Sequence, residues 1–540
     1  MGTVSFINKK PENVLNESEL PWHYTPSIYS HIKAHLNAET GDITEDGESL
    51  PDDERQFGED QLRWAAGALD GVFGHHGGGA EAAQNTAKTI ASYVVEIANN
   101  DSQQAKIELY NRLCEGNLLG YIDEMVEEIV KAEIYPQPYF HKFAQFLAIR
   151  SPDREQVKFA IALLGLIADP ADKETVLLLG KHDEFTLYTT VALSNMLENP
   201  EAELWELAKT VHGWGRIHLV ERLAALDNPD IKQWLIREGY RNTVMYEYLA
   251  YLCATQGGLK MALSNAVIDD ELLMSAGEII DALLAGGPAE DIDDYEDAAY
   301  VLSRYLTHFE SKAATLEHLN VTGSILSYLN DEQWDANERA KNGWNERNRT
   351  LTIEQAQRII DDPKWKAMVE SGFASTERAA FYTANRAAKL LQMDTWDIHW
   401  QRLQANPDDD GCWFEIMQRA NADNIAQITD YAVSVWPLSK VATGAQDELG
   451  FGKEYAIHRC LDYILQDLGT YPKLGWPLIE AGLKSPVTRN RHMAIKTLAA
   501  WGQENWNAEI RLALEQAMSV EPKDDVKETI AQVLAGKASL

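Results

Sequence analysis

A helical repeat is the feature that most limits how this chain can fold. Five apolar segments recur between residues 157 and 280 at intervals of about 28 to 30 residues, a period typical of stacked repeat proteins. The segments begin at Val157, Leu187, Arg216, Val244 and Leu272. Within each one, apolar residues return at the three- and four-residue spacing of a single helix face. A unit this short cannot bury its apolar face alone, so the copies must pack on one another.

A shorter helical pattern precedes each of the last four segments, in residues 173–179, 202–211, 231–238 and 258–267. The repeating unit is therefore predicted to be a helical hairpin. This hairpin resembles the HEAT-like repeats, here about 28–35 residues each, and the resemblance is clearest in residues 476–501 around the turn at Ser485 and Pro486. Almost no alternating strand pattern occurs. The sequence predicts an all-α fold, an α-solenoid of stacked helical hairpins.

Charge limits the kind of partner that such a chain can bind. Among its 540 residues, 84 Asp and Glu outnumber 48 Lys and Arg, which gives a formal net charge of -36. A phosphate backbone would meet a repulsive average field, so nucleic acid is disfavoured as a partner. Hydrophobic residues make up 45% of the chain, too many for a disordered acidic tail. The pattern favours a folded protein that binds a basic protein partner.

The cysteines and the apolar runs point to a cytoplasmic protein. Cys114, Cys253, Cys412 and Cys460 lie too far apart in sequence for CxxC redox pairs or a disulfide framework. The N-terminus has no apolar leader segment, and the longest apolar run, about 159–168, is much shorter than the 18 or so residues of a membrane span. We expect a reducing compartment and no membrane association.

Composition divides the chain into four parts. Residues 1–60 are expected to be an N-terminal segment that has a short helix at 27–36 and ends in a solvated acidic linker, because 41–60 carries nine acids and one Arg. Residues 61–330 and 353–540 are predicted to be two solenoid parts. The polar, aperiodic stretch 331–352 is predicted to be a hinge or insertion between them. Residues 339–389 hold ten basic residues against six acids and offer an alternative site for an anionic ligand or nucleic acid.

Motifs of common enzymes are missing, and the sequence predicts no cofactor. It contains no dinucleotide-binding glycine fingerprint, no GxSxG and no HExxH. Residues 42–53 space their oxygen ligands somewhat like a calcium loop, but Asp53 stands where a bidentate Glu is needed, which favours an ordinary acidic loop. The adjacent His75 and His76 precede a glycine run and could contact a metal or an anion, although a helix cap and loop explains them better.

A short fragment of a non-haem iron site also occurs. His182-Asp183-Glu184 has the H-x-[DE] form, and His212 or His218 could supply a third ligand. Three-residue matches are frequent by chance, and an acidic helix N-terminus accounts for the same residues. No metal site is predicted.

The most distinctive string runs from 211 to 223 and is the predicted partner-binding site. Helical periodicity places Ile217, Val220 and Leu223 toward the core and leaves the charged residues on or beside the exposed face. Trp and Arg anchor many protein interfaces. The candidate residues are therefore His212, Trp214, Arg216, His218, Glu221 and Arg222. Packing between repeats and ion pairs within the helix explain the string equally well.

This string also resembles a family of bacterial proteins commonly labelled limonene hydroxylase, most closely over residues 212–254. The resemblance implies a monooxygenase that activates oxygen through haem, flavin or non-haem iron. The residues themselves favour a non-enzymatic binding protein, in the manner of an inhibitor, immunity-type or assembly factor for a basic partner. The monooxygenase and the anionic-ligand site in 339–389 stay as alternatives.

Overall fold

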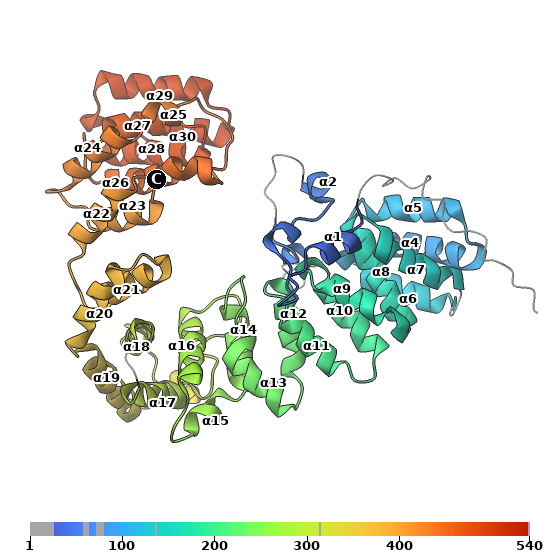
Figure 1. Ribbon diagram of the computed structural model, residues 1–540. Coiled ribbons are helices and arrows are strands. Elements are labelled where there is room, and N and C mark those ends of the chain that lie inside the picture. Colours follow the sequence, from blue (N-terminus) through green and yellow to red (C-terminus); the bar gives the residue numbers. More distant parts are fainter. Residues whose placement is uncertain (1–25, 58–63, 72–79, 135–137, 313–314, 538–540) are drawn as a thin grey trace, which may run out of the picture. The chain divides into compact units, whose positions relative to one another are not determined.

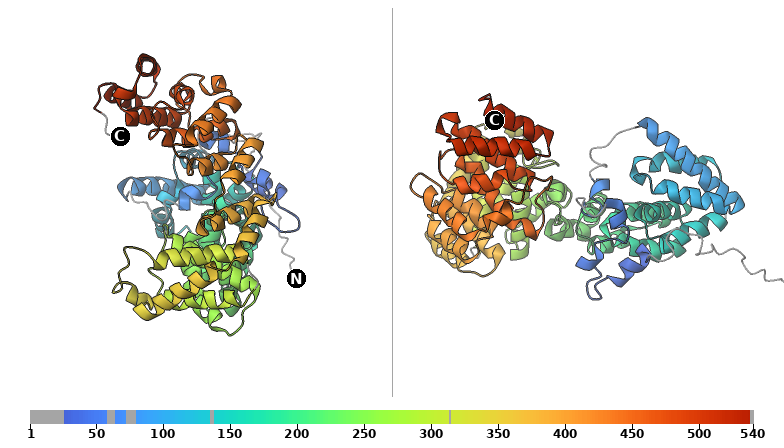
Figure 2. Two further views of the ribbon diagram at one scale, coloured as in Figure 1. Left: turned by 90° about the vertical axis from the view of Figure 1, so that its left-hand side faces the viewer. Right: turned by 90° about the horizontal axis from the view of Figure 1, so that it is seen from above.

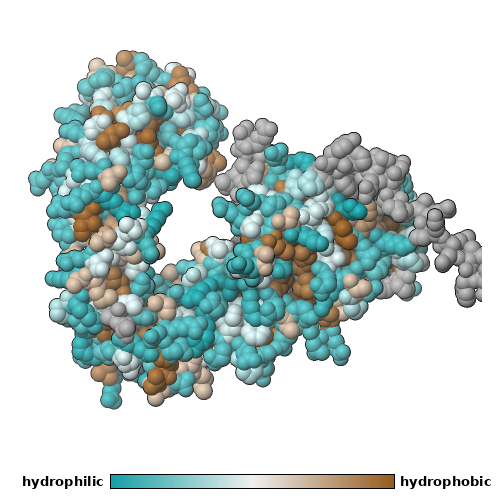
Figure 3. Space-filling view, viewed as in Figure 1, coloured by the Kyte–Doolittle hydropathy of each residue, from teal (hydrophilic) through white to brown (hydrophobic). Residues whose placement is uncertain are grey.

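The computed structural model describes residues 26–57, 64–71, 80–134, 138–312 and 315–537. These residues are helical with irregular connections and contain two isolated β-bridges but no β-strand, so the predicted all-α fold is confirmed (Figures 1 and 2). None of their helices is long and apolar enough to cross a membrane. Hydrophilic residues make up most of the face seen in Figure 3.

The chain forms two compact units that divide between Trp365 and Lys366. Unit 1 contains α1 (Ile28–Ala34), α2 (Asp53–Phe57), α4 (Ala80–Asn100), α5 (Gln103–Leu113), α6 (Ile122–Lys131), α7 (Pro138–Arg150), α8 (Arg154–Ile167), α9 (Lys173–Gly180), α10 (Asp183–Met196), α11 (Glu201–Ala208), α12 (Trp214–Ala224), α13 (Pro229–Trp234), the π-helical turn η5 (Leu235–Gly239), α14 (Glu247–Gln256), α15 (Leu259–Ser264), α16 (Asp270–Ala285), α17 (Ala298–Glu310), α18 (Leu316–Leu329) and α19 (Glu346–Ile360).

The division falls within α20 (Lys364–Phe373). Unit 2 continues with α21 (Arg378–Leu390), α22 (Trp396–Ala405), α23 (Asp410–Met417), α24 (Ile425–Val435), α25 (Leu438–Val441), α26 (Ala456–Leu468), α27 (Trp476–Leu483), α28 (Thr488–Trp501), α29 (Ala508–Val520) and α30 (Asp524–Leu534). Short 3-10 turns join several of these helices in both units.

In unit 1 a series of long helices packs in chain order. Helix α8 contacts α10, α10 contacts α12, α12 contacts α14, and the series continues through α16 and α18 to α19. Each contributes fully buried residues to the core, among them Leu164, Leu193, Leu223, Cys253 and Ile280. Burying one such apolar side chain stabilises the fold by roughly 1.5–3 kcal/mol. The apolar recurrence in the sequence therefore corresponds to one packed row of helices.

Four of the five predicted long segments lie within helices, and the fifth begins later than predicted. Helix α14 starts at Glu247, whereas the pattern predicts a start at Val244. The Oδ1 atom of Asn242 accepts hydrogen bonds from the backbone N–H groups of Val244 and Met245. An Asn side chain that bonds ahead in this way favours a turn over a helix.

The stretch 331–352 is an integral part of unit 1 and does not separate the two units. The guanidinium of Arg339 lies over the rings of Tyr328 and Trp334, at 4.5 and 4.4 Å, and pairs with Asp293 at 3.0 Å. Trp344 is also buried. The polar composition of this stretch suggested a hinge. In the structure, its cation Arg339 instead has an acidic and two aromatic partners within unit 1.

The acidic segment 41–57 is likewise folded onto unit 1, so the expectation of a solvated linker is wrong. Leu50 and Phe57 are buried, and so is Asp52, which is 4% exposed. Helix α1 precedes this segment close to the predicted helix 27–36, and Ser27 caps its N-terminus. Two of its carboxylates, Asp52 and Asp53, face the buried guanidinium of Arg154, as described below.

In unit 2 the helices α23, α26, α28 and α30 pack in order, and the hairpin of α27 and α28 matches the predicted boundaries. A buried ion pair joins this hairpin to its neighbour. The Nε and Nη2 atoms of Arg491 lie 2.7 and 2.8 Å from the two carboxylate oxygens of Glu521, and both side chains are 1% exposed. The Nη1 atom of Arg491 also donates to the carbonyls of Ser485 and Pro486.

We predict that Arg491→Met lowers the free energy of unfolding of unit 2 by about 3–5 kcal/mol, because Glu521 is left buried without its counter-charge. The double change Arg491→Met with Glu521→Leu should restore most of this loss. Urea denaturation of the full chain measures the effect, and hydrogen exchange in α28 and α30 assigns it to unit 2. The exposed pair of Lys484 and Glu480 is the control: Lys484→Met should cost less than about 1 kcal/mol. Equal losses for Arg491→Met and Lys484→Met would contradict the prediction.

Candidate functional site

A pocket of about 460 Å³ lies in unit 1 where three successive turns of the repeat meet. The turns are 181–183 between α9 and α10, 210–213 between α11 and α12, and 243–244 before α14. They follow one another at about thirty residues, the period of the repeat. Residues of the N-terminal segment, from 43 to 53 and from 64 to 66, complete the wall.

Hydrogen bonds join each of these turns to the next. The Oδ1 atom of Asp183 accepts from the backbone N–H groups of Gly213 at 3.1 Å and Gly215 at 2.6 Å. The carbonyl of His212 in turn accepts from the backbone N–H of Thr243 at 2.6 Å and from its hydroxyl at 3.1 Å. A side chain in one turn therefore caps the first N–H groups of the following long helix.

The glycines of the 211–223 string are needed for this contact. A Cβ atom at position 215 would lie 2.3 Å from the Oγ1 of Thr186 and 2.8 Å from the Oδ1 of Asp183. The ring of Trp214 is buried, with its centroid 5.0 Å from that of Tyr248, and it fills the space beside Gly71. The unusual residues of this string thus allow the turn 210–213 to contact Asp183 on one side and Thr243 on the other.

The expected position of Arg216 on or beside the exposed face is wrong, since this residue is only 5% exposed. Trp214 is buried to the same degree. The Nη2 atom of Arg216 donates to the carbonyl of Glu238 at 2.8 Å, and its guanidinium lies over Trp234. Burial lowers the pKa of this guanidinium. The π-helical turn η5 therefore covers a face of α12 that helical periodicity alone left open to solvent.

The six predicted partner-binding residues are divided by the structure. His212 and Trp214 line the pocket, and the side chain of His212 is exposed at its rim. Glu221 and Arg222 are exposed further along α12, and His218, partly buried, lies 3.8 Å from Glu221. A role in partner binding stays a prediction for the exposed members.

A buried charge network, which sequence reasoning missed, supports the pocket. The ammonium of Lys158 on α8 is 2% exposed and lies 2.7 Å from Glu184, 2.8 Å from Asp70 and 3.2 Å from Glu155. One feature of the sequence could have predicted this network: Lys158 lies inside the apolar run 157–164. A lysine in such a run is expected to be buried, and a buried lysine needs carboxylate partners.

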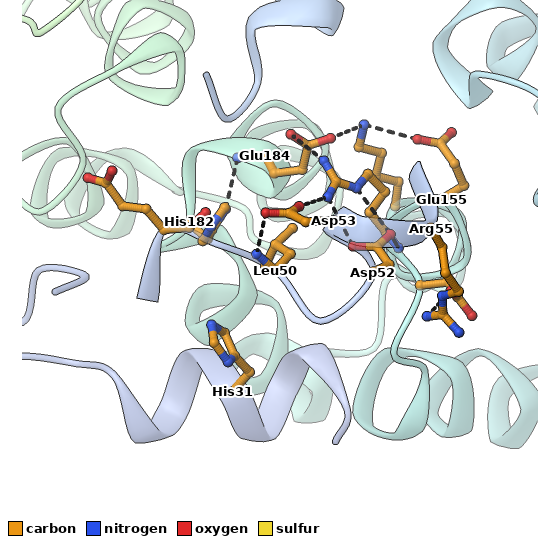
Figure 4. Close-up of polar contacts among 12 residues, drawn as sticks. His31, Leu50, Asp52, Asp53, Arg55, Glu155, His182 and Glu184 are labelled. Atoms are coloured by element: carbon orange, nitrogen blue, oxygen red, sulfur yellow. Dashed lines mark hydrogen bonds and ion pairs between the residues drawn. The ribbon is translucent and has the colours of Figure 1, made fainter. Parts of the chain in front are cut away.

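Arg154, one helical turn before Lys158, binds the N-terminal segment. Its guanidinium contacts Asp52 at 3.0 Å, Asp53, and Glu184 at 3.7 Å (Figure 4). It also lies over the ring of Phe57 at 5.0 Å. These contacts hold segment 41–57 against the start of α8 and thereby place the N-terminal wall of the pocket.

Two neighbouring carboxylates on α10 have different pKa values because their surroundings differ. Burial tends to raise the pKa of Glu184, but Lys158 and Arg154 outweigh burial and lower it to about 2. Burial raises the pKa of Asp183 to about 6, although the N–H groups of Gly215 and Gly213 oppose the shift. Glu184 is therefore a fixed anion, whereas Asp183 gains its proton only a little below neutral pH.

The iron fragment does not form a ligand set. Burial lowers the pKa of His182 to about 4, its Nδ1 accepts from the backbone N–H of Glu184, and its Nε2 contacts the carbonyl of Glu48 at 3.2 Å. The carboxylate of Glu184 points to Arg154 and Lys158. No group of three or more His, Cys, Asp or Glu among the described residues is arranged to hold a metal ion. The residues thus do not fit a non-haem iron site, which is one of the three oxygen-activating groups that the family resemblance allows.

Two further sequence candidates were the calcium-like loop 42–53 and the histidine pair His75 and His76. Asp53 of the calcium-like loop contacts Arg154 and accepts from the backbone N–H of Leu50 at 3.2 Å. His75 and His76 lie outside the described residues.

The basic stretch 339–389 includes the division between the two units, so its cations do not belong to one compact unit. Several of them already have anionic or aromatic partners: Arg339 with Asp293, Arg358 with Glu310, Lys364 with Asp362, Arg378 with Tyr382, and Lys389 with Glu415.

Comparisons with known proteins assign no family. No family model and no curated protein matches the chain. An engineered protein of known crystal structure aligns with 83% of this chain and 98% of its own at 15% identity and a TM-score of 0.23. A likeness of that size carries no argument about fold or function.

We predict that Gly215→Ala destabilises unit 1 by about 1–3 kcal/mol, because the new methyl group overlaps Thr186 and Asp183. Gly116→Ala is a matched control, since a Cβ there has no atom within 4 Å. Thermal unfolding of the two variants measures the difference. Equal melting temperatures would show that the close approach of α12 to Asp183 is not needed.

The raised pKa of Asp183 predicts a pH dependence of stability. The folded carboxyl binds a proton near pH 6 and the unfolded one near its ordinary pKa of about 4, so the contribution of Asp183 to stability rises as the pH falls from 7.5 to 5. Asp183→Asn keeps an oxygen acceptor for Gly213 and Gly215 and removes the titration. We expect the variant to gain about 1–3 kcal/mol over the parent at pH 7.5 and less at pH 5, measured by urea denaturation. A gain independent of pH would contradict the assignment.

Proposed function

We propose that this chain is a non-enzymatic, HEAT-like helical-repeat protein, an α-solenoid, that binds a basic protein partner. The observation that carries the proposal is the pocket at three successive turns, 181–183, 210–213 and 243–244. In stacked repeat proteins the turns of neighbouring repeats form a continuous binding surface. The helix row from α8 to α19 supports this arrangement, because each long helix packs on the next.

Charge supports the choice of partner. The chain carries a formal net charge of -36, and many of its cations are already paired with its own acids. An acidic surface accelerates the approach of a basic protein and suppresses that of nucleic acid. An inhibitor, immunity-type or assembly factor for a basic protein fits these features, as does any other binder of cationic chains.

The alternatives have less support. A monooxygenase needs a group that activates oxygen, and His182, Glu184 and His218 do not converge. In 339–389, Arg339, Arg358, Lys364 and Lys389 already pair with carboxylates of the chain, which leaves fewer cations for an anion site.

Panning a random peptide library against the immobilised full chain tests the proposal. We expect peptides with a net positive charge to be enriched at 0.1 M salt and recovered poorly at 1 M salt, where the Debye length falls from about 10 to about 3 Å. Immobilised polyglutamate is the control for unspecific attraction to acids. The proposal is wrong if the chain enriches the same peptides as polyglutamate does. It is also wrong if the enriched peptides are acidic or uncharged.

A further inference from the structure

The pocket contains a fixed carboxylate oxygen that the fold does not use. The Oδ1 atom of Asp183 accepts the two backbone N–H groups of α12. Its Oδ2 atom has no hydrogen-bond partner among the described residues. Asp183 lines the pocket, and its two bonds through Oδ1 hold the carboxylate in one orientation. Pre-oriented acceptors of this kind bind ligands with a small loss of conformational entropy.

Two other groups in the wall are open to a ligand. The side chain of Glu48 is exposed and forms no ion pair with the described residues, while its backbone carbonyl contacts His182. Trp64 is 52% exposed and lines the same pocket. A cation attracted by the carboxylates could also lie against an aromatic face, a contact worth about 0.5–1 kcal/mol at an exposed site.

The cations near the pocket do not neutralise these carboxylates. Arg154 is bound to Asp52, Asp53 and Glu184 beneath the wall. Lys181 donates to the carbonyl of Gly41 at 2.9 Å, and the lowered pKa of His182 keeps it uncharged at neutral pH. Two carboxylates of the lining, Glu48 and Asp183, outnumber Lys181. His212 also lines the pocket, and its Nε2 atom lies 3.3 Å from the carboxylate of Asp42. The lining together with Asp42 therefore carries a net negative charge. An anion would be repelled, and an apolar ligand would leave the Asp183 oxygen without a partner.

We propose that this pocket binds the side chain of an arginine on the protein partner, an inference that rests on the proposed function. A guanidinium suits the wall better than an ammonium, because it is planar, offers several N–H donors to the carboxylates of Asp183 and Glu48, and stacks on an indole such as Trp64. The cationic group would enter between the turns 181–183 and 210–213 and the N-terminal wall.

Two small probes of the same shape test the charge requirement. N-acetyl-arginine amide carries a guanidinium, whereas N-acetyl-citrulline amide has a neutral urea of nearly the same size. The full chain is labelled with 5-fluorotryptophan, and the fluorine resonance of Trp64 is assigned by its loss in Trp64→Phe. We expect the arginine probe to shift this resonance in a saturable way and the citrulline probe to leave it unchanged. Equal shifts with both probes would overturn the proposal.

Carboxylate variants test the site itself. Glu48→Gln with Asp183→Asn should weaken binding of the arginine probe about tenfold or more, since two charge-assisted contacts are lost. The control Glu509→Gln with Glu515→Gln removes the same charge from exposed positions on α29 and should leave binding unchanged. Thermal unfolding must first show that both double variants are folded. Unchanged affinity in the pocket variant, or equal losses in both, would refute the arginine site.

The outcomes separate this inference from the proposed function. If basic peptides from the panning bind the parent and the Glu48→Gln, Asp183→Asn variant equally, the chain is still a binder of basic partners but the pocket is not the arginine site. If no basic peptide is selected while the arginine probe still binds at Trp64, the pocket is confirmed as a guanidinium site and the protein-binding function is wrong.

Discussion

The N-terminal half of unit 1 depends on two cations buried on one face of α8. Arg154 and Lys158 lie one helical turn apart, and bringing either into the protein interior without counter-charges would cost several kcal/mol. Asp52, Asp53, Asp70, Glu155 and Glu184 supply those charges from four separate parts of the chain. The need to neutralise α8 therefore draws the acidic N-terminal segment and the start of α10 to the same place.

The pocket is a result of this arrangement. The contacts of Arg154 fix the segment that holds Glu48 and Asp53, and the contacts of Lys158 fix Glu184 at the start of α10. Asp183, next to Glu184, then reaches the N-terminus of α12. Adjacent residues on one helix thus have different roles. Glu184 pairs with the buried cations Lys158 and Arg154, and Asp183, which lines the pocket, joins α10 to the N-terminus of α12.

Helices could be predicted because the apolar spacing that marks them is local in the sequence. Leu193 and Leu223 are buried where periodicity places them. Arg216 was placed wrongly because a helical wheel does not show that the π-helical turn 235–239 covers its side of α12. The role of Asp52 was hidden for another reason: its partner Arg154 is 102 residues away, and no local pattern links them. Charges that look solvated in sequence can be the counter-ions of a distant helix.

The spacing of these ion pairs also bears on the order in which the protein can fold during synthesis. Asp52 and Asp70 leave the ribosome long before Arg154 and Lys158, but Glu184 follows them by about thirty residues. Helix α8 can therefore form as soon as it emerges, yet its cations acquire their full set of counter-charges only after the start of α10 has been made. Helix α4 can pack on α5, α6 and α7 before that point, whereas the joint closure of the N-terminal segment, α8 and α10 has to wait for residue 184.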